Sequence, residues 1–168
     1  MCLATSAAYA GNSSISQAQL VALDGHTVSL PSQLPGRATV LIIGFGRHSQ
    51  DATTPWEKAV RLRLAHVPAV GFYDMAMLAE VPAFLRSFVI GRIREAVPDV
   101  LKPNFIPLTE DEDRWKRTAG FDPAFAEAPY VLLVDRAGGV RWSSHAAFTE
   151  AGFAELSRAA QQLSTETH

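Results

Sequence analysis

Cysteine is almost absent from this sequence of 168 residues, whose one cysteine is Cys2 at the amino-terminal end. Thiol-disulfide exchange and thiol peroxidase reactions both require a reactive thiolate. We therefore expect no thiol-disulfide oxidoreductase or thiol peroxidase activity. The lack of cysteine does not decide whether the chain is an enzyme of another kind, but a non-catalytic role is favoured.

Basic residues are not in excess, and long hydrophobic runs are missing. The 15 Lys and Arg residues are interspersed with 17 Asp and Glu residues, for a formal net charge of −2. A protein that binds a phosphate backbone usually carries a basic patch, so no nucleic-acid partner is expected. No apolar stretch approaches the ~20 residues of a membrane-spanning helix, so no transmembrane segment is expected either.

The spacing typical of metal ligands is also missing. The histidines include no His-x-His sequence and no pair four residues apart, and none has a cysteine partner. No metal and no other cofactor is therefore expected. The histidines are His26, His48, His66, His145 and His168.

The overall composition, with 48% hydrophobic and 19% charged residues, is typical of one soluble globular domain. A chain of this length can bury a sufficient core without disulfides or metals. The sequence contains no internal repeat and no linker long enough to separate two domains.

The first ten residues are small and apolar and end in Ala8-Tyr9-Ala10, before the polar start Gly11-Asn12. An Ala-x-Ala sequence before a polar segment is typical of a signal-peptidase site, although the charged start and the full apolar segment are missing. We interpret residues 1–16 as a signal-peptide remnant and flexible start, 17–163 as a single domain and 164–168 as a polar tail. This interpretation predicts an exported or periplasmic bacterial protein. A disordered cytoplasmic amino terminus is the alternative.

Strand signals dominate the first quarter of the domain. Residues 19–23 and 27–30 are short alternating runs joined through Asp24-Gly25, a dipeptide that favours the tight turn of a hairpin. Residues 38–45 are apolar and β-branched in their middle, which predicts a central strand buried on both faces.

Helix signals follow. Thr54-Pro55-Trp56-Glu57 combines an N-cap, a first-turn proline and a capping-box glutamate, and predicts a helix that begins at Thr54 and ends near residue 65. In residues 81–97 apolar side chains recur with helical spacing, which predicts an amphipathic helix whose apolar face serves either core packing or a dimer interface. A second capping box at residues 109–112 predicts a helix that ends near Gly120. The other predicted elements are strands over 67–73, 104–108, 130–135 and 140–143 and a last helix that opens at Phe148-Thr149, with a hydrophobic staple between Phe148 and Phe153.

The predicted order is hairpin, β, α, β, α, β, α, β, β, α, which is typical of an α/β three-layer sandwich. This order, with Pro129 directly before a buried strand, resembles the peroxiredoxin-type variant of the thioredoxin-like fold, here with an N-terminal β-hairpin and an inserted amphipathic helix. The resemblance implies a cis Ala128-Pro129 bond beside the active-site turn. It also implies thiols in the turn after the first long strand, where this chain has Gly46-Arg47-His48-Ser49 instead.

Two further segments resemble the mitochondrial ATP synthase assembly-factor family of redoxin-like proteins. In that family a helix that carries an arginine precedes an Asp-x-x-Gly-x-hydrophobic-Arg-Trp hairpin. Arg92 lies in the matching helix here, and residues 135–142 match the hairpin, which ends in Arg141-Trp142. The resemblance covers roughly residues 30–163. It implies a cysteine-independent role in the assembly of a membrane complex through binding of a protein partner.

Two groups of candidate binding residues emerge. The first group lies on the turn before a helix and consists of Arg47, His48 and Asp51. Unpaired N–H groups at the start of a helix favour binding of an anion or carboxylate there. The alternative is a solvent-exposed loop in which Asp51 caps the helix. The second group is Arg92, Arg141 and Trp142. Neighbouring residues of a strand face opposite sides, so if Trp142 points into the core, Arg141 points outward and is available to a partner. Arg92 can then converge with Arg141 on the same partner. The alternative is an ordinary arginine on an edge strand.

The leading hypothesis is a non-catalytic redoxin-like binding or assembly-factor protein that recognises a protein partner at this turn and hairpin. The alternative is a cysteine-independent enzyme or redox accessory that uses Arg47, His48 and Asp51. The sequence does not indicate the identity of the partner or the oligomeric state.

Overall fold

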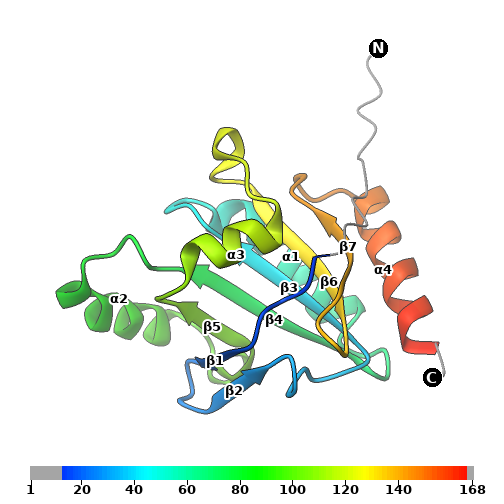
Figure 1. The fold of residues 1–168 in the computed structure, drawn as a ribbon, viewed down its shortest axis with the longest axis horizontal. Helices are drawn as coiled ribbons and strands as arrows, with labels where there is room; N and C mark the ends of the chain where they lie inside the picture. The colour runs from blue at the N-terminus through cyan, green and yellow to red at the C-terminus, as the bar shows by residue number, and fades with distance from the viewer. Residues whose placement is uncertain (1–12, 166–168) are drawn as a thin grey trace.

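A five-stranded mixed sheet with strand order β5-β4-β3-β6-β7 forms the centre of the molecule (Figure 1). The computed structural model describes residues 13–165 of the chain. Strand β3 runs parallel to β4 and antiparallel to β6, while β5 is parallel to β4 and β7 antiparallel to β6. The strands of this sheet are β3 (Ala38–Gly44), β4 (Val70–Met77), β5 (Phe105–Leu108), β6 (Pro129–Asp135) and β7 (Val140–Ser144).

The other elements surround this sheet. A separate hairpin is made of β1 (Ala18–Val21) and β2 (Thr27–Leu30). The helices are α1 (Gln50–Arg63), α2 (Ala83–Ala96), α3 (Glu112–Ala119) and α4 (Glu150–Thr165), and two short 3-10 helices are η1 (Asp99–Asn104) and η2 (Pro123–Phe125). The predicted α/β order of strands and helices is therefore confirmed in full.

Strand β3 is the central strand, and all seven of its residues are buried. Its side chains alternate between two hydrophobic cores because successive residues of a strand face opposite sides. Leu41 and Ile43 pack against α3 and the β1–β2 hairpin on one face. Val40 and Ile42 pack against α1 and α4 on the other face. The sheet is thus covered on both sides, as expected for a three-layer sandwich.

Helix α1 begins one turn earlier than the predicted start at Thr54. The Ser49 carbonyl accepts the N–H groups of Ala52 and Thr53, so the turn after β3 continues directly into the helix. Pro55 consequently lies inside α1, where it removes one intrahelical hydrogen bond. Thr54 is no N-cap, since its hydroxyl donates to the Gln50 carbonyl at 2.7 Å.

The predictions for the two later helices have different outcomes. Helix α3 is preceded by Asp111 in the left-handed conformation, and its N-cap makes no side-chain hydrogen bond, so the capping box predicted from Thr109 is wrong. Its end at Gly120, also left-handed, is as predicted. Before α4, the rings of Phe148 and Phe153 lie 6.1 Å apart, which confirms the predicted staple.

The predicted cis Ala128-Pro129 bond is not found. Within residues 13–165 the cis peptide bond is Leu30–Pro31, and the Ala128–Pro129 bond is trans. Before Pro129 the chain forms a turn in which the Ala128 N–H donates to the Phe125 carbonyl at 3.0 Å. Because an X-Pro bond prefers trans unless its surroundings impose cis, this entry into β6 keeps the default isomer.

The described domain is slightly longer than residues 17–163. Ile15 is buried, and its N–H donates to the Gly138 carbonyl at 2.9 Å, so residues 13–16 already pack on the domain. Helix α4 continues to Thr165. Most of the expected signal-peptide remnant, including Cys2, and the last three residues of the expected tail lie outside the described residues.

Helix α2 projects from the body of the molecule beyond β4 and β5 (Figure 1). None of its 14 described residues is buried. No helix within the described part of the chain is long and apolar enough to cross a membrane.

Candidate functional site

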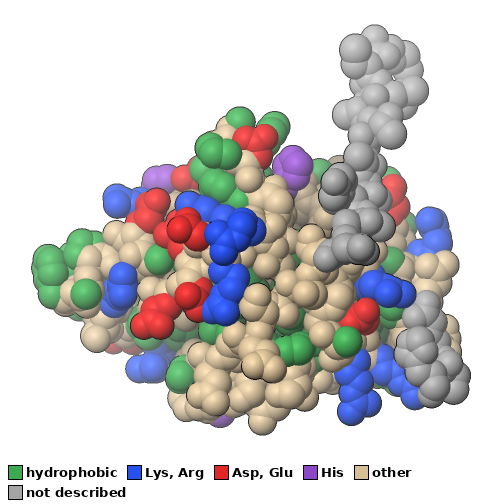
Figure 2. Space-filling model, viewed as in Figure 1, with side chains coloured by type: hydrophobic (Ala, Val, Ile, Leu, Met, Phe, Trp, Pro, Cys, Tyr) green, Lys and Arg blue, Asp and Glu red, His purple; other side chains and the backbone are tan. Residues whose placement is uncertain are grey.

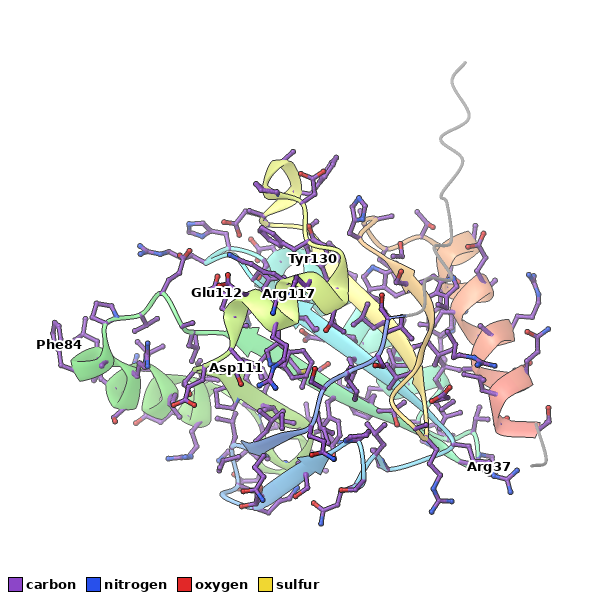
Figure 3. The ribbon with its side chains drawn as sticks, viewed as in Figure 1. Arg37, Phe84, Asp111, Glu112, Arg117 and Tyr130 are labelled. Atoms are coloured by element: carbon purple, nitrogen blue, oxygen red, sulfur yellow. The ribbon has the colours of Figure 1, made fainter. Side chains whose placement is uncertain are left out.

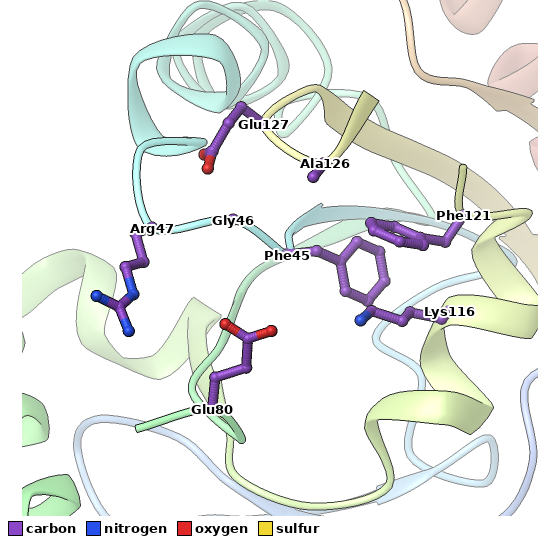
Figure 4. Close-up of a pocket in the computed structure, with 8 residues that line it drawn as sticks. All are labelled: Phe45, Gly46, Arg47, Glu80, Lys116, Phe121, Ala126 and Glu127. Carbon is purple, nitrogen blue, oxygen red and sulfur yellow. The ribbon is translucent and has the colours of Figure 1, made fainter. Parts of the chain in front are cut away.

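A cavity of about 350 Å³ opens at the carboxyl ends of β3 and β4 (Figure 4). Because β3 and β4 are parallel, the segments that follow them meet at the same edge of the sheet, where ligands of open α/β sheets commonly bind. Phe45, Gly46 and Arg47 follow β3, and Glu80 follows β4. The other lining residues, from α3 and from the segment before β6, are Lys116, Phe121, Ala126 and Glu127.

The floor of the cavity is aromatic. The ring of Phe45 lies 5.1 Å from that of Phe121 and 5.2 Å from that of Tyr130, in edge-to-face arrangements. The Tyr130 hydroxyl accepts the Asp122 N–H at 3.1 Å. Since edge-to-face rings hold one another in place, this floor is a preformed apolar surface.

Two basic and two acidic side chains surround the aromatic floor, and two of the four already have partners. Lys116 Nζ lies 2.5 Å from Glu112 Oε1 and 4.6 Å from the centre of the Phe121 ring. Glu127 Oε2 accepts the backbone N–H of His48 at 2.8 Å. Within residues 13–165, the side chains of Arg47 and Glu80 form no hydrogen bond or ion pair. Figure 4 shows both directed toward the shared space, so they are the charges available to a ligand.

The turn that precedes α1 is occupied by a carboxylate of the protein itself. A Cβ atom added to Gly46 would lie only 2.3 Å from Glu127 Oε2, so a larger residue there would displace the Glu127 carboxylate from this position. The same carboxylate accepts the His48 N–H. The predicted anion site at Arg47 and His48 is therefore filled at its backbone end by Glu127.

The structure separates the first group of predicted site residues. Arg47 lines the cavity, whereas His48 and Asp51 are exposed and do not line it. Asp51 lies in the first turn of α1, where its charge opposes the helix dipole favourably. These three residues thus do not form one cluster.

The second group is also separated. Arg92 is on α2, where it pairs with Glu95 at 3.0 Å, and Arg141 is on β7, where it lies 3.6 Å from Asp135. Helix α2 lies beyond one edge of the sheet and β7 forms the opposite edge (Figure 1), so the predicted convergence of Arg92 and Arg141 is wrong. Trp142 is buried, and its ring lies 6.2 Å from that of Trp56, which makes it a core residue.

Away from the cavity, a buried acidic side chain of β4, Asp74, lies close to the partly buried Glu57 of α1. Asp74 of β4 is only 9% exposed, and its Oδ1 has no hydrogen-bond partner among the described residues. Burial raises the pKa of Asp74 well above its usual range, the Glu57 carboxylate raises it further, and Arg61 opposes the shift. Burial likewise raises the pKa of Glu57, against a hydrogen bond from Thr53 and the charge of Arg61. No group of three or more potential metal ligands occurs in residues 13–165.

Sequence reasoning missed most of the cavity. Glu80, Lys116, Phe121 and Glu127 come from three segments that are far apart along the chain. Arg47 follows a predicted strand closely, whereas the parallel pairing of β3 and β4 that brings Glu80 to the same edge is seen only in the structure. Asp74 also had a signal, as the one charged residue within the otherwise uncharged segment that forms β4.

The fold has many counterparts among solved structures. No protein-family model and no curated protein sequence matches the chain. BsSco, a member of the Sco family of cytochrome c oxidase assembly proteins with an identified disulfide switch, superposes with a TM-score of 0.64 at 15% identity, over 95% of this chain and 98% of BsSco. The exposed lipoprotein thioredoxin Etrx1 from Streptococcus pneumoniae has a TM-score of 0.60 at 12% identity, over 85% of this chain and 98% of Etrx1.

A thioredoxin-family thiol:disulfide interchange protein from Chlorobium tepidum has a TM-score of 0.56 at 15% identity, over 91% of this chain and 99% of its own. Identities this low carry information about the fold and not about the activity. With the sheet order and the two covered faces described above, they show that this chain has the thioredoxin-like fold.

Proposed function

We propose that this protein is a non-catalytic, thioredoxin-like binding protein whose cavity at the end of β3 recognises a polypeptide partner. The observation that carries the proposal is the replacement of a thiol site by a charged cavity. The turn after β3 contains no cysteine, and the cavity beside it offers Arg47 and Glu80 above an aromatic floor.

The chemistry of the cavity favours a short peptide segment as the ligand. A volume of about 350 Å³ is at the lower end of the range for ligand pockets and suits one or two side chains. The rings of Phe45 and Phe121 provide apolar contact. Arg47 and Glu80 then select a segment that carries an acidic and a basic group on either side of an apolar residue.

A role in assembly of a membrane complex outside the cytoplasm belongs to the same proposal. The resemblance of residues 88–94 and 130–142 to the assembly-factor family supports it. BsSco belongs to a family of assembly proteins, and Etrx1 is an exposed lipoprotein, so the same fold serves in both settings.

The first test uses the full chain with a photo-crosslinking amino acid at position 126, expressed in its native host, because Ala126 lines the cavity and carries no charge that the ligand would need. A matched protein carries the same group at Arg158, an exposed position on α4. We expect a polypeptide that is crosslinked from position 126 and not from position 158. The crosslinked protein, once purified, is then titrated against wild-type protein and against Arg47→Glu and Arg158→Glu.

Binding is expected to weaken at least about tenfold for Arg47→Glu and to stay unchanged for Arg158→Glu, since a tenfold loss corresponds to about 1.4 kcal/mol. Equal capture at both positions, or equal affinity of both variants, contradicts recognition at the cavity. Turnover of disulfides or peroxides well above background by the Cys2→Ser protein contradicts the non-catalytic part of the proposal.

The alternative, a cysteine-independent enzyme or redox accessory, requires Arg47, His48 and Asp51 to act on one substrate. Two of these side chains lie outside the cavity lining, which disfavours it. His48→Ala distinguishes the two functions, because an enzyme loses turnover with its stability intact while the binding protein retains its partner.

A further inference from the structure

The outer face of α2 is apolar and exposed. Phe84 is 83% exposed and Phe88 is 66% exposed, and Figure 2 shows hydrophobic side chains gathered at this end of the molecule. Figure 3 places Phe84 at the outer end of α2. Isolated exposed apolar residues are ordinary, but two phenylalanines one turn apart on a projecting helix form a continuous patch.

The opposite face of α2 holds the helix to the body through polar contacts. Arg86 donates to the carbonyls of Val81 and Ala79, at 2.9 and 2.8 Å. Arg94 donates to the carbonyl of Leu23 at 2.9 Å. These contacts fix the direction in which α2 projects, so the outer face is presented to solvent in a defined orientation.

Gly91 lies on the same outer stripe as the two phenylalanines. Four residues follow one another along this stripe at intervals of four, three and four, which is the heptad spacing of a coiled-coil seam. These seam residues are Phe84, Phe88, Gly91 and Glu95. A glycine inside a helix costs about 1 kcal/mol relative to alanine. A Cβ atom added to Gly91 would meet nothing within 4 Å, so packing within the described chain does not require this glycine. It forms a notch on an exposed seam.

We propose that α2 is a homodimerisation element that pairs antiparallel with α2 of a second copy. In an antiparallel pair the two kinds of seam position face one another across the interface. Phe88 of each copy then lies opposite the Gly91 notch of the other, and Phe84 lies opposite Glu95. The seam is thus complementary to itself in shape, because the Phe88 ring of each copy fills the space that the missing side chain of Gly91 leaves on the other.

The charges on α2 are compatible with this pairing. Within each helix, Arg92 Nη1 lies 3.0 Å from Glu95 Oε2 in an ion pair, so the two charges at this end of the seam cancel. Phe84 of the second copy packs on the stems of this pair, with its ring beside the Arg92 guanidinium, an arrangement that favours cation–π attraction. No unpaired charge is buried by the contact.

The dimer is expected to be reversible. A helix of 14 residues is about 21 Å long and presents a face about 10 Å wide. This area is well below the ~800 Å² per partner of a standard stable interface. The proposal concerns a surface separate from the cavity, so its failure leaves the proposed binding function untouched.

The test is sedimentation velocity of the full chain over a concentration series across the micromolar range. We expect reversible dimerisation by the wild type and at least about tenfold weaker association for Phe88→Ala and for Gly91→Leu. Gly91→Leu is the sharper variant, since it adds apolar area and helix propensity while it fills the notch. Leu62→Ala is the matched control, because Leu62 is a 56% exposed leucine on α1 and its loss leaves the seam intact.

The orientation is tested in a Cys2→Ser background. In the antiparallel pair Leu85 of one helix approaches Arg92 of the other, so a mixture of Leu85→Cys and Arg92→Cys proteins is expected to crosslink into heterodimers with a short thiol-reactive linker. A wild type that stays monomeric throughout the series overturns the proposal. Undiminished self-association of Gly91→Leu also overturns it, because that result indicates a non-specific apolar surface. Binding of both Gly91→Leu and wild type to phospholipid vesicles, without dimerisation, overturns it as well.

Discussion

Helices α1 and α2 are both 14 residues long, and each follows one of the two central parallel strands, yet they have opposite environments. Helix α1 buries Trp56, Ala59 and Val60 against the sheet. Helix α2 has the more apolar sequence of the two and buries none of its described residues. Apolar periodicity therefore identifies a face that can be buried, whereas the rest of the fold decides whether the same chain buries it.

The largest effect that separates the two helices is expected from Trp56→Ala. Trp56 is 1% exposed, its ring packs on those of Trp142 and Phe148, and its Nε1 donates to the Ala146 carbonyl at 3.1 Å. We expect a loss of about 3–5 kcal/mol in the free energy of unfolding, measured with urea. Phe88→Ala on α2, measured at a concentration where the protein is monomeric, should change it by less than about 0.5 kcal/mol. Similar losses for both contradict the comparison.

The buried Asp74 beside Glu57 of α1 gives the next effect. Asp74→Asn keeps the shape of the side chain but removes the group that must be buried as a charge above its raised pKa, and we expect a gain on the order of 1–3 kcal/mol at pH values above that pKa. The measurement is urea unfolding across a pH series. A stability loss for Asp74→Asn above the raised pKa would show that the charged carboxylate is itself stabilising.

The same series tests the direction of the pH dependence. Because the pKa values of Asp74 and Glu57 are raised in the folded state, the folded protein binds more protons than the unfolded chain between the ordinary and the raised pKa values. Wild-type stability should therefore fall as pH rises from about 4 through the raised pKa values. Asp74→Asn should flatten this slope.

Arg86→Ala tests whether α2 opens independently of the core. The Arg86 guanidinium holds the start of α2 through two carbonyls, and hydrogen bonds to charged groups contribute about 1.5–3 kcal/mol. We expect amide hydrogen exchange across residues 83–96 to become at least about tenfold faster, with exchange in β3 unchanged. Faster exchange in both elements would show that α2 is part of the cooperative core.

The smallest effect is expected at the carboxyl end of α1. Arg63 donates to both carboxylate oxygens of Glu150 of α4 and lies 4.2 Å from the centre of the Phe153 ring. Both partners are exposed enough for solvent to weaken the pair, so Arg63→Ala should cost about 0.5–1 kcal/mol in the same unfolding measurement. An Arg63→Lys variant retains the charge without the bidentate geometry and should recover only part of that loss.

The elements could be predicted from the sequence because their signals are local. The Asp24-Gly25 turn, the buried run that forms β3 and the left-handed Gly120 all act within a few residues. The start of α1 was predicted wrongly because the Ser49 carbonyl begins the helix before Thr54, an arrangement that depends on how the turn leaves β3. Of the cavity, Arg47 was predicted and its partners were not.

The sequence by itself determined which chemistry is missing and which elements form. A chain whose only cysteine is Cys2 has no thiol in the turn after β3, and local residue patterns are enough to indicate the order of the strands and α-helices. The tertiary structure alone decided that Glu127 accepts the His48 N–H in the turn, that Arg47 and Glu80 line the same cavity and that Arg92 and Arg141 lie apart. It also decided that α1 is covered while α2 is exposed. The physical reason is that burial and charge pairing depend on residues far apart along the chain, whereas periodicity and capping act only between near neighbours.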